Sequence, residues 1–305
     1  MYLRDVFLED TFAEAFPMRV ARIVITAVNA RWAREAALKL TGFATSVIAC
    51  KCEAAIERVL DSSETPDGRP GTSVLLFAMD TESLGKRLIE RVGQTVLTCP
   101  TTSCFDGLPA AERRVTPGRA LRVFGDGFQA SKVVAGERYW RIPVMEGEYL
   151  MQESFGVATG VGGGNFLILA TDAESALASA EAAVAAIEGM PGVILPFPGG
   201  IARSGSKVGS RRYKGLAAST NDAYCPTLRP LTTSALPPEV NSVLELVLDG
   251  LDEDAIRRAM RAGIDAACRP GVRAISAGNY GGKLGPHHFY LREIMGAARE
   301  AGTPA

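Results

Sequence analysis

The chain has 305 residues, more than a single hydrophobic core usually serves, so two domains are expected. Its 33 Lys and Arg nearly balance 34 Asp and Glu, which argues against a broad nucleic-acid-binding surface and leaves only local cationic sites. No apolar run reaches the roughly 18 residues of a membrane span, and the N-terminus lacks the apolar stretch of a signal peptide, so we expect a cytoplasmic protein.

The first half of the chain is predicted to alternate between strands and helices. Asn29 and Asp80 precede amphipathic stretches and are typical helix N-caps, and Gly42 is placed to end the first helix. The predicted order is strand 22–28, helix 31–40, strand 44–50, helix 53–60, strand 73–79 and helix 81–92.

The second half repeats much of this order. Strand 164–170 leads through an acidic cap into a long helix, and strand 242–250 leads into another amphipathic helix. Placing Val74 over Val243 aligns strand–Asp–helix units at an offset of 169 residues (243 − 74). We therefore predict an α+β fold of two similar lobes, each an antiparallel sheet with helices on one face. The predicted domains are 1–145 and 146–305.

Cysteine and histidine are too scattered to predict a metal site. The six cysteines form no C-x-x-C pair, and the adjacent His287 and His288 would point to opposite faces of a strand. Free thiols in a reducing compartment are therefore expected. Without an independent histidine base, the sequence favours direct group transfer over a covalent acyl-enzyme.

Two glycine-rich segments are candidate anion-binding sites. Within 196–215, the glycine spacing of a Walker A loop is present, but Ser206 follows Gly205 and Lys207 comes one position late, which argues against nucleotide hydrolysis. Flexible backbone N–H groups there and in 276–285 favour an anionic, coenzyme-like ligand. The predicted ligand-binding residues are Gly199, Gly200, Ser204, Gly205, Lys207, Arg211, Tyr280, Gly281 and Lys283.

The alternatives for these segments are ordinary. Each glycine cluster, taken alone, also fits a tight surface turn. The cations Lys207, Arg211, Arg212 and Lys214 also fit a solvated basic face.

Glu245 interrupts the otherwise apolar strand 242–250. By two-residue alternation it shares a face with Val243 and Val247. Burial there would raise the pKa of its carboxyl toward the range that suits proton transfer near neutrality. A solvated face or an arginine partner is the alternative. Other acids, among them Glu14 and Asp67, fit helix caps or surface charges.

Ten stretches running in order from residue 9 to about 285 together resemble one family, the formylmethanofuran–tetrahydromethanopterin formyltransferases. The most distinctive are "EDTFAEAFPM" and "ISAGNYGGKLG", and shorter ones include "PFPGGI", "SGSKVG" and "GLDEDAI". The resemblance implies a homo-oligomer, typically a tetramer, with lobes of ferredoxin-like, split βαβ type. It also implies formyl transfer between N5 of tetrahydromethanopterin and the amine of methanofuran, two carriers with acidic tails, without a metal or a tightly bound cofactor.

The resemblance also sharpens the site prediction. A glutamate on the strand before "GLDE" is implicated at the family's reaction centre, and Glu245 occupies that place. We expect Glu245 to relay protons, with Ser206, Asn279 and loop N–H groups stabilising the oxyanion. The composition is similar to the version of methylotrophic bacteria, whose formyltransferase works with hydrolase and accessory subunits in formaldehyde oxidation. A catalytically idle scaffold subunit of such a complex is the alternative.

Overall fold

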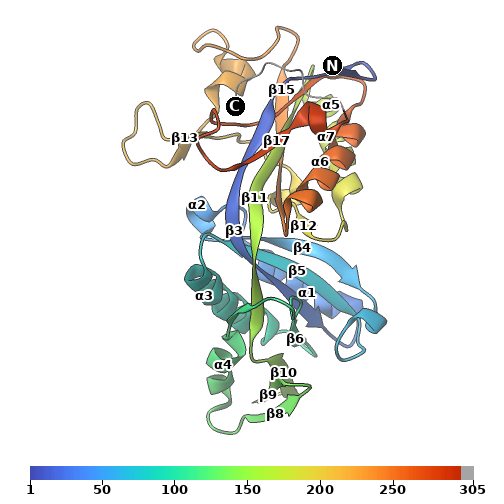
Figure 1. Cartoon of the computed structure of the whole chain (residues 1–305), viewed down its shortest axis with the longest axis vertical. Coiled ribbons are helices and arrows are strands. Elements are labelled where there is room, and N and C mark those ends of the chain that lie inside the picture. The colour runs from blue at the N-terminus through green and yellow to red at the C-terminus, as the bar shows by residue number, and fades with distance from the viewer. Residues whose placement is uncertain (297–305) are drawn as a thin grey trace. The chain divides into compact units, whose positions relative to one another are not determined.

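The computed structural model describes residues 1–296, which form two compact units (Figure 1). The last nine residues of the predicted second domain lie outside this range. Unit 1 comprises Met1–Pro17, Val161–Glu188 and the chain from Phe197, whereas unit 2 comprises Met18–Gly160 and Gly189–Pro196. Each unit therefore combines segments from both halves of the sequence, because the division falls within two long strands. These are β3 (Phe12–Thr26) and β11 (Phe155–Ala170).

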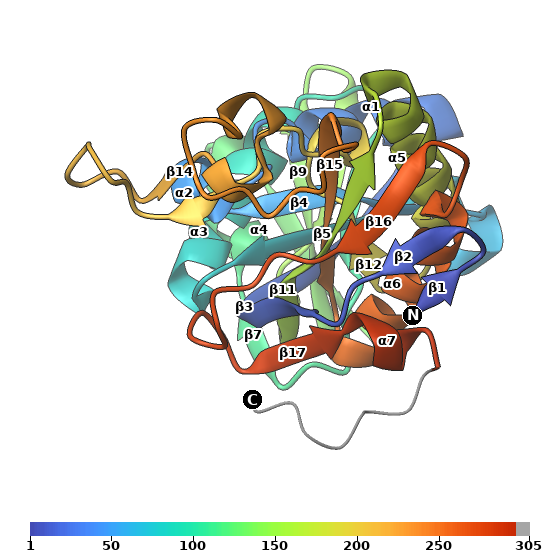
Figure 2. The ribbon, with the colours of Figure 1, turned by 90° about the horizontal axis from the view of Figure 1, so that it is seen from above.

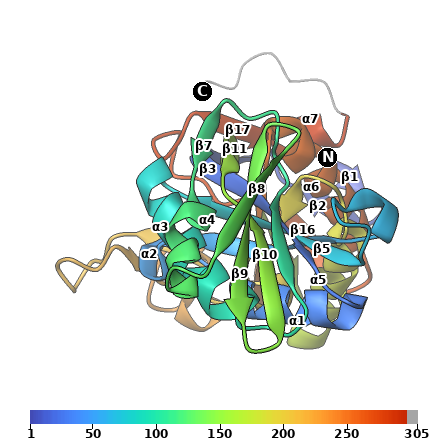
Figure 3. The same cartoon turned by 90° about the horizontal axis from the view of Figure 1, so that it is seen from below.

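Unit 2 is built on a sheet of order β4-β5-β3-β6-β10-β9-β8, of which β8, β9 and β10 are seen most clearly in Figure 3. Neighbouring strands are antiparallel except β6 and β10, which are parallel. A further strand, β7 (Arg113–Val115), pairs with the start of β11. The strands not yet defined are β4 (Glu53–Leu60), β5 (Gly71–Ala78), β6 (Ser103–Asp106), β8 (Ala130–Val134), β9 (Glu137–Val144) and β10 (Gly147–Gln152).

Helices pack against this sheet on the face that carries Ile23 and Val74. Asn29 caps the first helix through a 3.2 Å bond from the Trp32 N–H, and Asp80 caps the third through a 2.8 Å bond from the Ser83 N–H. Both caps and the C-terminal position of Gly42 confirm the sequence prediction. The helices are α1 (Ala30–Thr41), α2 (Val47–Cys50), α3 (Thr81–Arg91) and α4 (Pro117–Leu121).

Two predictions in unit 2 are wrong. Residues 44–50, predicted as a strand, contain the short helix α2, and residues 53–60, predicted as a helix, form strand β4. The sequence of β4 is rich in helix-favouring Glu and Ala, but its pairing with the fully buried strand β5 decides its conformation. Tertiary pairing overrides local propensity here.

Unit 1 contains a sheet of order β15-β11-β16-β2-β1. Antiparallel pairing joins β11 to both of its neighbours, whereas β16 and β2 are parallel. Its strands are β15 (Ser242–Gly250), β16 (Val272–Ser276), β2 (Val6–Leu8) and β1 (Tyr2–Leu3), and β17 (His287–Tyr290) pairs with residues 12–15 of β3.

Different elements pack on the two faces of this sheet (Figure 2). Helices α5 (Ala173–Ile187) and α6 (Glu253–Ala267) pack on one face; Asp172 is the predicted acidic cap of α5, and Asp252 caps α6. The other face carries Leu167, which packs with residues of the irregular segment 222–240. A small hairpin, β13 (Lys207–Val208) and β14 (Ala218–Ser219), precedes this segment in the chain, and the short α7 (Leu291–Ile294) follows β17.

Both units therefore have the predicted α+β character, with helices on one face of a largely antiparallel sheet. Strands β5 and β15 are each followed by an Asp-capped helix, as the internal repeat predicted, but the caps Asp80 and Asp252 are 172 residues apart (252 − 80), so the predicted offset of 169 is three residues short. None of the helices within residues 1–296 combines the length and apolar character needed to cross a membrane.

Candidate functional site

Strand β15 places Glu245 on the sheet face opposite α5 and α6, as the alternation predicted. On one side, Glu245 pairs with Leu167 of β11. On the other side, it forms an isolated antiparallel bridge with Ala202, with backbone N···O distances of 2.8 and 2.9 Å. The glycine-rich segment 197–206 therefore runs directly beside the acid.

The carboxylate of Glu245 makes no hydrogen bond or ion pair with any other residue that the structure describes. The side chain is partly buried, and burial raises its pKa to about 7. A carboxyl with this pKa exchanges a proton readily near neutral pH, which is the property required of a general acid and base.

The segment beside Glu245 exposes unused backbone donors. Gly199, Gly200 and Gly205 have φ values of +61°, +77° and +56°, which favour glycine. Ser204 and Ser206 are exposed, and their N–H groups, like that of Gly205, donate to no other residue in the described range. This part of the predicted ligand-binding set can therefore offer N–H groups to an anion.

Tyr280 connects this segment to the second glycine-rich loop. Its hydroxyl donates to the backbone oxygen of Ser206 at 3.3 Å. Burial raises the pKa of the Tyr280 hydroxyl, and the negative charges of Glu245 and Glu14 raise it further. The structure thus brings Tyr280, Ser206 and Glu245 together within unit 1.

Asn279, a predicted oxyanion donor, has both of its side-chain N–H donors engaged within the protein. It donates to the Thr11 hydroxyl at 3.0 Å and to the Phe12 carbonyl at 3.2 Å, and its oxygen accepts from the Gly281 N–H at 3.2 Å. These bonds attach the loop to β3. They indicate a structural role for Asn279, because no amide hydrogen is left for a substrate.

Glu14 is the important residue that our sequence analysis set aside. It is 1% exposed, and its carboxylate accepts hydrogen bonds from the backbone N–H groups of Tyr280, Gly282, Leu284 and Gly285. The second glycine-rich loop does bind an anion, but the anion is the protein's own. The signal was available, because Glu14, like Glu245, interrupts an apolar strand.

The predicted cations of the first segment also have an internal partner. Lys207 forms an ion pair with Asp222, and Arg211 lies 2.9 Å from the other oxygen of the same carboxylate. The Lys207 bond, together with the charge of Arg211, lowers the pKa of Asp222 against the opposing effect of desolvation. In contrast, Arg212 and Lys214 are exposed on the hairpin, and Lys283 is exposed on the second loop.

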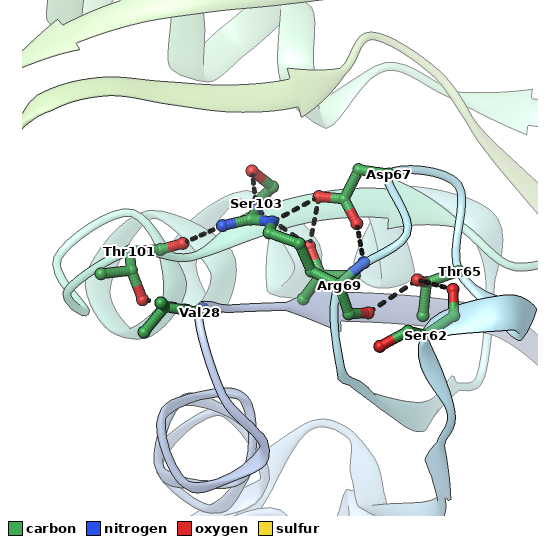
Figure 4. Close-up of polar contacts among 8 residues, drawn as sticks. Val28, Ser62, Thr65, Asp67, Arg69, Thr101 and Ser103 are labelled. Atoms are coloured by element: carbon green, nitrogen blue, oxygen red, sulfur yellow. Dashed lines mark hydrogen bonds and ion pairs between the residues drawn. The ribbon is translucent and has the colours of Figure 1, made fainter.

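A separate polar cluster in unit 2 closes the turn that contains Asp67 (Figure 4). The Arg69 guanidinium donates to Asp67 at 2.8 Å, to the Thr101 carbonyl at 2.6 Å and to the Ser103 hydroxyl at 2.7 Å. Thr26 also donates to Asp67, at 2.8 Å. Because these groups satisfy one another, the cluster is a structural clamp between the turn and strands β3 and β6.

The histidines and cysteines have ordinary roles. His287 lies 2.8 Å from the Glu253 carboxylate, and His288 lies 3.1 Å from the Gly285 carbonyl, so the two rings meet different partners. All six cysteines are free thiols. In the described part of the chain, no three His, Cys, Asp or Glu side chains are grouped so that they could hold a metal ion.

Comparison with known proteins places the chain in a family. A family model described as formylmethanofuran-tetrahydromethanopterin formyltransferase matches residues 1–144, and one described as the proximal lobe of the same enzyme matches residues 147–294. The chain belongs to this formyltransferase family. The two matches meet near residue 145, although the compact units combine segments from both.

Relatives extend over nearly the whole chain. Formyltransferases of Methylococcus capsulatus and Methylobacillus flagellatus are 60% and 59% identical, each with 97% of this chain and 100% of the relative covered. That of Methanosarcina acetivorans is 50% identical with the same coverage. The family resemblance and the enzyme class predicted from the sequence are thereby confirmed.

Two solved structures share the fold. The Methanosarcina barkeri enzyme superposes with a TM-score of 0.92 at 49% identity, covering 97% of this chain and 100% of that one. The formyltransferase/hydrolase complex of Methylorubrum extorquens, solved with methylofuran, superposes with a TM-score of 0.94 at 49% identity, covering 97% and 98%. The chain is a formyltransferase of the two-lobed α+β type.

Proposed function

We propose that this formyltransferase moves the formyl group directly between N5 of tetrahydromethanopterin and the amine of methanofuran, with both carriers bound at once. The observation that carries the mechanism is Glu245, a partly buried acid without a partner in the described chain, whose pKa is raised to about 7 by burial. It lies beside a segment of unused N–H donors. No covalent intermediate is required.

Glu245 serves as the proton relay in this mechanism. When transfer runs toward methanofuran, the neutral amine of methanofuran attacks the formyl carbon bound to N5 of the pterin, and a new C–N bond forms. The Glu245 carboxylate accepts the proton that the attacking nitrogen must lose. It then returns this proton to N5 as the bond between N5 and carbon breaks, so that the acid ends in its starting form.

The segment beside Glu245 supplies the oxyanion donors. The N–H groups of Ser204, Gly205 and Ser206, with the Ser206 hydroxyl, can stabilise the negative oxygen of the tetrahedral intermediate. The loss of one such donor typically costs about 3 kcal/mol of transition-state stabilisation. Correct positioning of the two carriers can contribute roughly 7–11 kcal/mol more.

The acidic carrier tails are bound by local cations. Lys207 and Arg211 both contact the Asp222 carboxylate, so two positive charges lie close together against one negative charge and can attract a second anion. Lys283, which is exposed on the second glycine-rich loop, and the Gly199 N–H are further candidates, whereas the Gly200 N–H donates to the Phe197 carbonyl at 2.8 Å. A wholly solvated basic surface remains the alternative for Arg212 and Lys214 on the projecting hairpin.

The test is formyl transfer by the purified chain with both carriers, followed by the absorbance of the pterin. Transfer that requires both carriers and leaves no formylated protein supports the proposal. A formylated protein in rapid-quench mass spectrometry would contradict direct transfer. A folded chain that binds both carriers without transfer would instead indicate the scaffold role.

We also propose a homo-oligomer, typically a tetramer, that works in the cytoplasm with hydrolase and accessory subunits during one-carbon oxidation of formaldehyde. The Methylorubrum extorquens relative, whose structure is of a formyltransferase/hydrolase complex, supports this assignment. Co-purification from the native source, with the mass measured by light scattering, tests it. A monomer that purifies without a hydrolase would contradict it.

A further inference from the structure

The loop 278–285 is organised around one buried carboxylate. Glu14 of β3 accepts from the Tyr280 N–H at 2.7 Å, the Gly282 N–H at 3.1 Å and the Gly285 N–H at 2.9 Å, and also from the Leu284 N–H. Four donors in a six-residue stretch therefore converge on a single side chain.

This arrangement keeps Glu14 ionised. Burial alone would raise its pKa, but the four backbone hydrogen bonds more than offset burial, so the pKa lies below its usual value. The loop itself has no regular secondary structure to hold it. Gly281 and Gly282 have φ values of +69° and +74°, and this glycine-rich backbone forms neither helix nor strand.

The loop also lies directly on β3. A Cβ atom added at Gly285 would lie 2.2 Å from the Ala15 carbonyl oxygen, so only glycine permits this approach. Asn279 attaches the other end of the loop through Thr11 and Phe12. Tyr280 is held between these two attachments, with its own N–H on Glu14.

From this geometry we propose that Glu14 is a positioning residue for formyl transfer: it fixes the loop that holds the Tyr280 hydroxyl beside Ser206 and Glu245. Glu14 does not touch the reacting atoms in this proposal. It acts through Tyr280, whose hydroxyl donates to the Ser206 carbonyl and borders the oxyanion-donor segment. The catalytic part rests on the proposed function, whereas the control of the loop by Glu14 does not.

A double-mutant cycle separates positioning from simple stabilisation. Glu14→Gln replaces two acceptor lone-pair directions with N–H donors that face N–H groups, so the loop should shift. We expect kcat to fall about tenfold or more in both Glu14→Gln and Tyr280→Phe. If Glu14 acts through Tyr280, the double variant should match Tyr280→Phe in kcat, while Glu14→Gln still lowers the melting temperature in either background. Independent, multiplicative effects on kcat would overturn the proposal.

Glu57→Gln is the matched control. Glu57 is also a buried carboxylate with several hydrogen bonds, but it belongs to unit 2. Glu57→Gln should lower the melting temperature about as much as Glu14→Gln does. It should leave kcat unchanged, and it should not alter the effect of Tyr280→Phe on kcat. If Glu57→Gln reproduces the kcat loss of Glu14→Gln, the role of Glu14 is purely structural and the proposal fails.

Two further measurements keep the proposal testable. Should Glu14→Gln fail to fold, Glu14→Asp retains the charge on a shorter side chain, and its kcat should lie between those of the wild type and Tyr280→Phe. A crystal structure of the Glu14→Gln variant shows the position of the loop independently of any activity assay. If loop 278–285 is unchanged in that structure, the positioning role of Glu14 is overturned, whether or not Glu245 is essential for transfer. If the loop is displaced but Glu245 is dispensable, only the proposed catalytic mechanism is contradicted.

Discussion

The two units surround an acid in opposite ways near equivalent positions of their sheets. The helix caps Asp80 and Asp252 are 172 residues apart (252 − 80), and the same offset relates Ser73 of β5 to Glu245 of β15 (245 − 73). Ser73 donates at 2.6 Å to the buried Glu57, which also binds Arg22. In unit 1, the acid itself occupies the equivalent position.

The partners of each acid account for the difference. Burial would raise the pKa of Glu57, but Arg22, Ser73 and the Gly192 N–H more than offset this, so its pKa lies below the usual value. Glu245 lacks such partners, and burial raises its pKa to about 7. A fully paired acid stabilises the fold, whereas an unpaired acid costs stability and is available for chemistry.

The largest expected effect is on turnover. Glu245→Gln should lower kcat by about 10²- to 10⁴-fold, because the amide cannot relay a proton. The KM for each carrier should change little, since the amide has nearly the same shape, and the variant should have a melting temperature at or above that of the wild type. Turnover within twofold of the wild type would remove Glu245 from the mechanism.

Glu57→Gln should have the converse effect. Removal of one partner from a buried ion pair typically costs 3–5 kcal/mol, and because Arg22 is only partly buried we expect about 3 kcal/mol in the free energy of unfolding. Denaturation by urea measures this loss. The kcat of the folded fraction should stay at the wild-type value, and a large fall in kcat would show that the comparison of the two acids is mistaken.

Glu245 and Glu57 should also make the free energy of unfolding depend on pH in opposite directions. Because the folded state raises the pKa of Glu245 from 4.5 to about 7, its proton is bound more tightly when folded, so stability from this group is lost as pH rises toward 7. Glu57, with a lowered pKa, contributes stability above its usual pKa that is lost as pH falls. Glu245→Gln should therefore gain up to about 2 kcal/mol relative to the wild type between pH 5 and 8. A constant difference across this range would contradict the raised pKa.

A smaller effect is expected on carrier binding. Lys207→Met and Arg211→Met should each raise the KM of at least one carrier about tenfold, with less effect at high salt because the contact is electrostatic. Arg212→Met on the exposed hairpin is the matched control and should have a smaller effect. Unchanged KM values would assign both cations to the ion pairs with Asp222 alone.

The smallest effect should come from Asn279→Ala. A direct oxyanion donor would lose about a hundredfold in kcat, whereas an attachment of the loop to β3 should lose about 1–2 kcal/mol of stability and less than tenfold in kcat. Steady-state kinetics with thermal unfolding distinguishes the two. A hundredfold loss in kcat at unchanged melting temperature would restore Asn279 to the oxyanion site.

Local patterns predicted the parts of the fold that depend on neighbouring residues. The capping positions Asn29, Asp80 and Asp172 and the strand alternation around Glu245 were all readable, because each depends on residues within a few positions. The same logic failed at β4 (Glu53–Leu60), where a helix-like composition is overruled by pairing with β5.

Contacts between distant segments are the part of the site that the sequence did not show. The bonds of Glu14 reach residues 266–271 positions later, and no local pattern shows that the loop's N–H groups are already occupied. The partnership of Lys207 and Arg211 with Asp222 likewise appears only in the fold. Sequence patterns therefore identified which groups could bind an anion but not which anion they already bind.

The assignment of Met1–Pro17 to unit 1 has a consequence for biosynthesis. Strand β2 pairs with β16, and Glu14 bonds to Tyr280, so the first residues to leave the ribosome need partners made almost last. At the usual elongation rate, that interval is on the order of tens of seconds. During it, most of unit 2 can fold while the N-terminal segment stays unpaired, and nascent chains stalled before residue 272 should keep this segment open to chaperones and proteases.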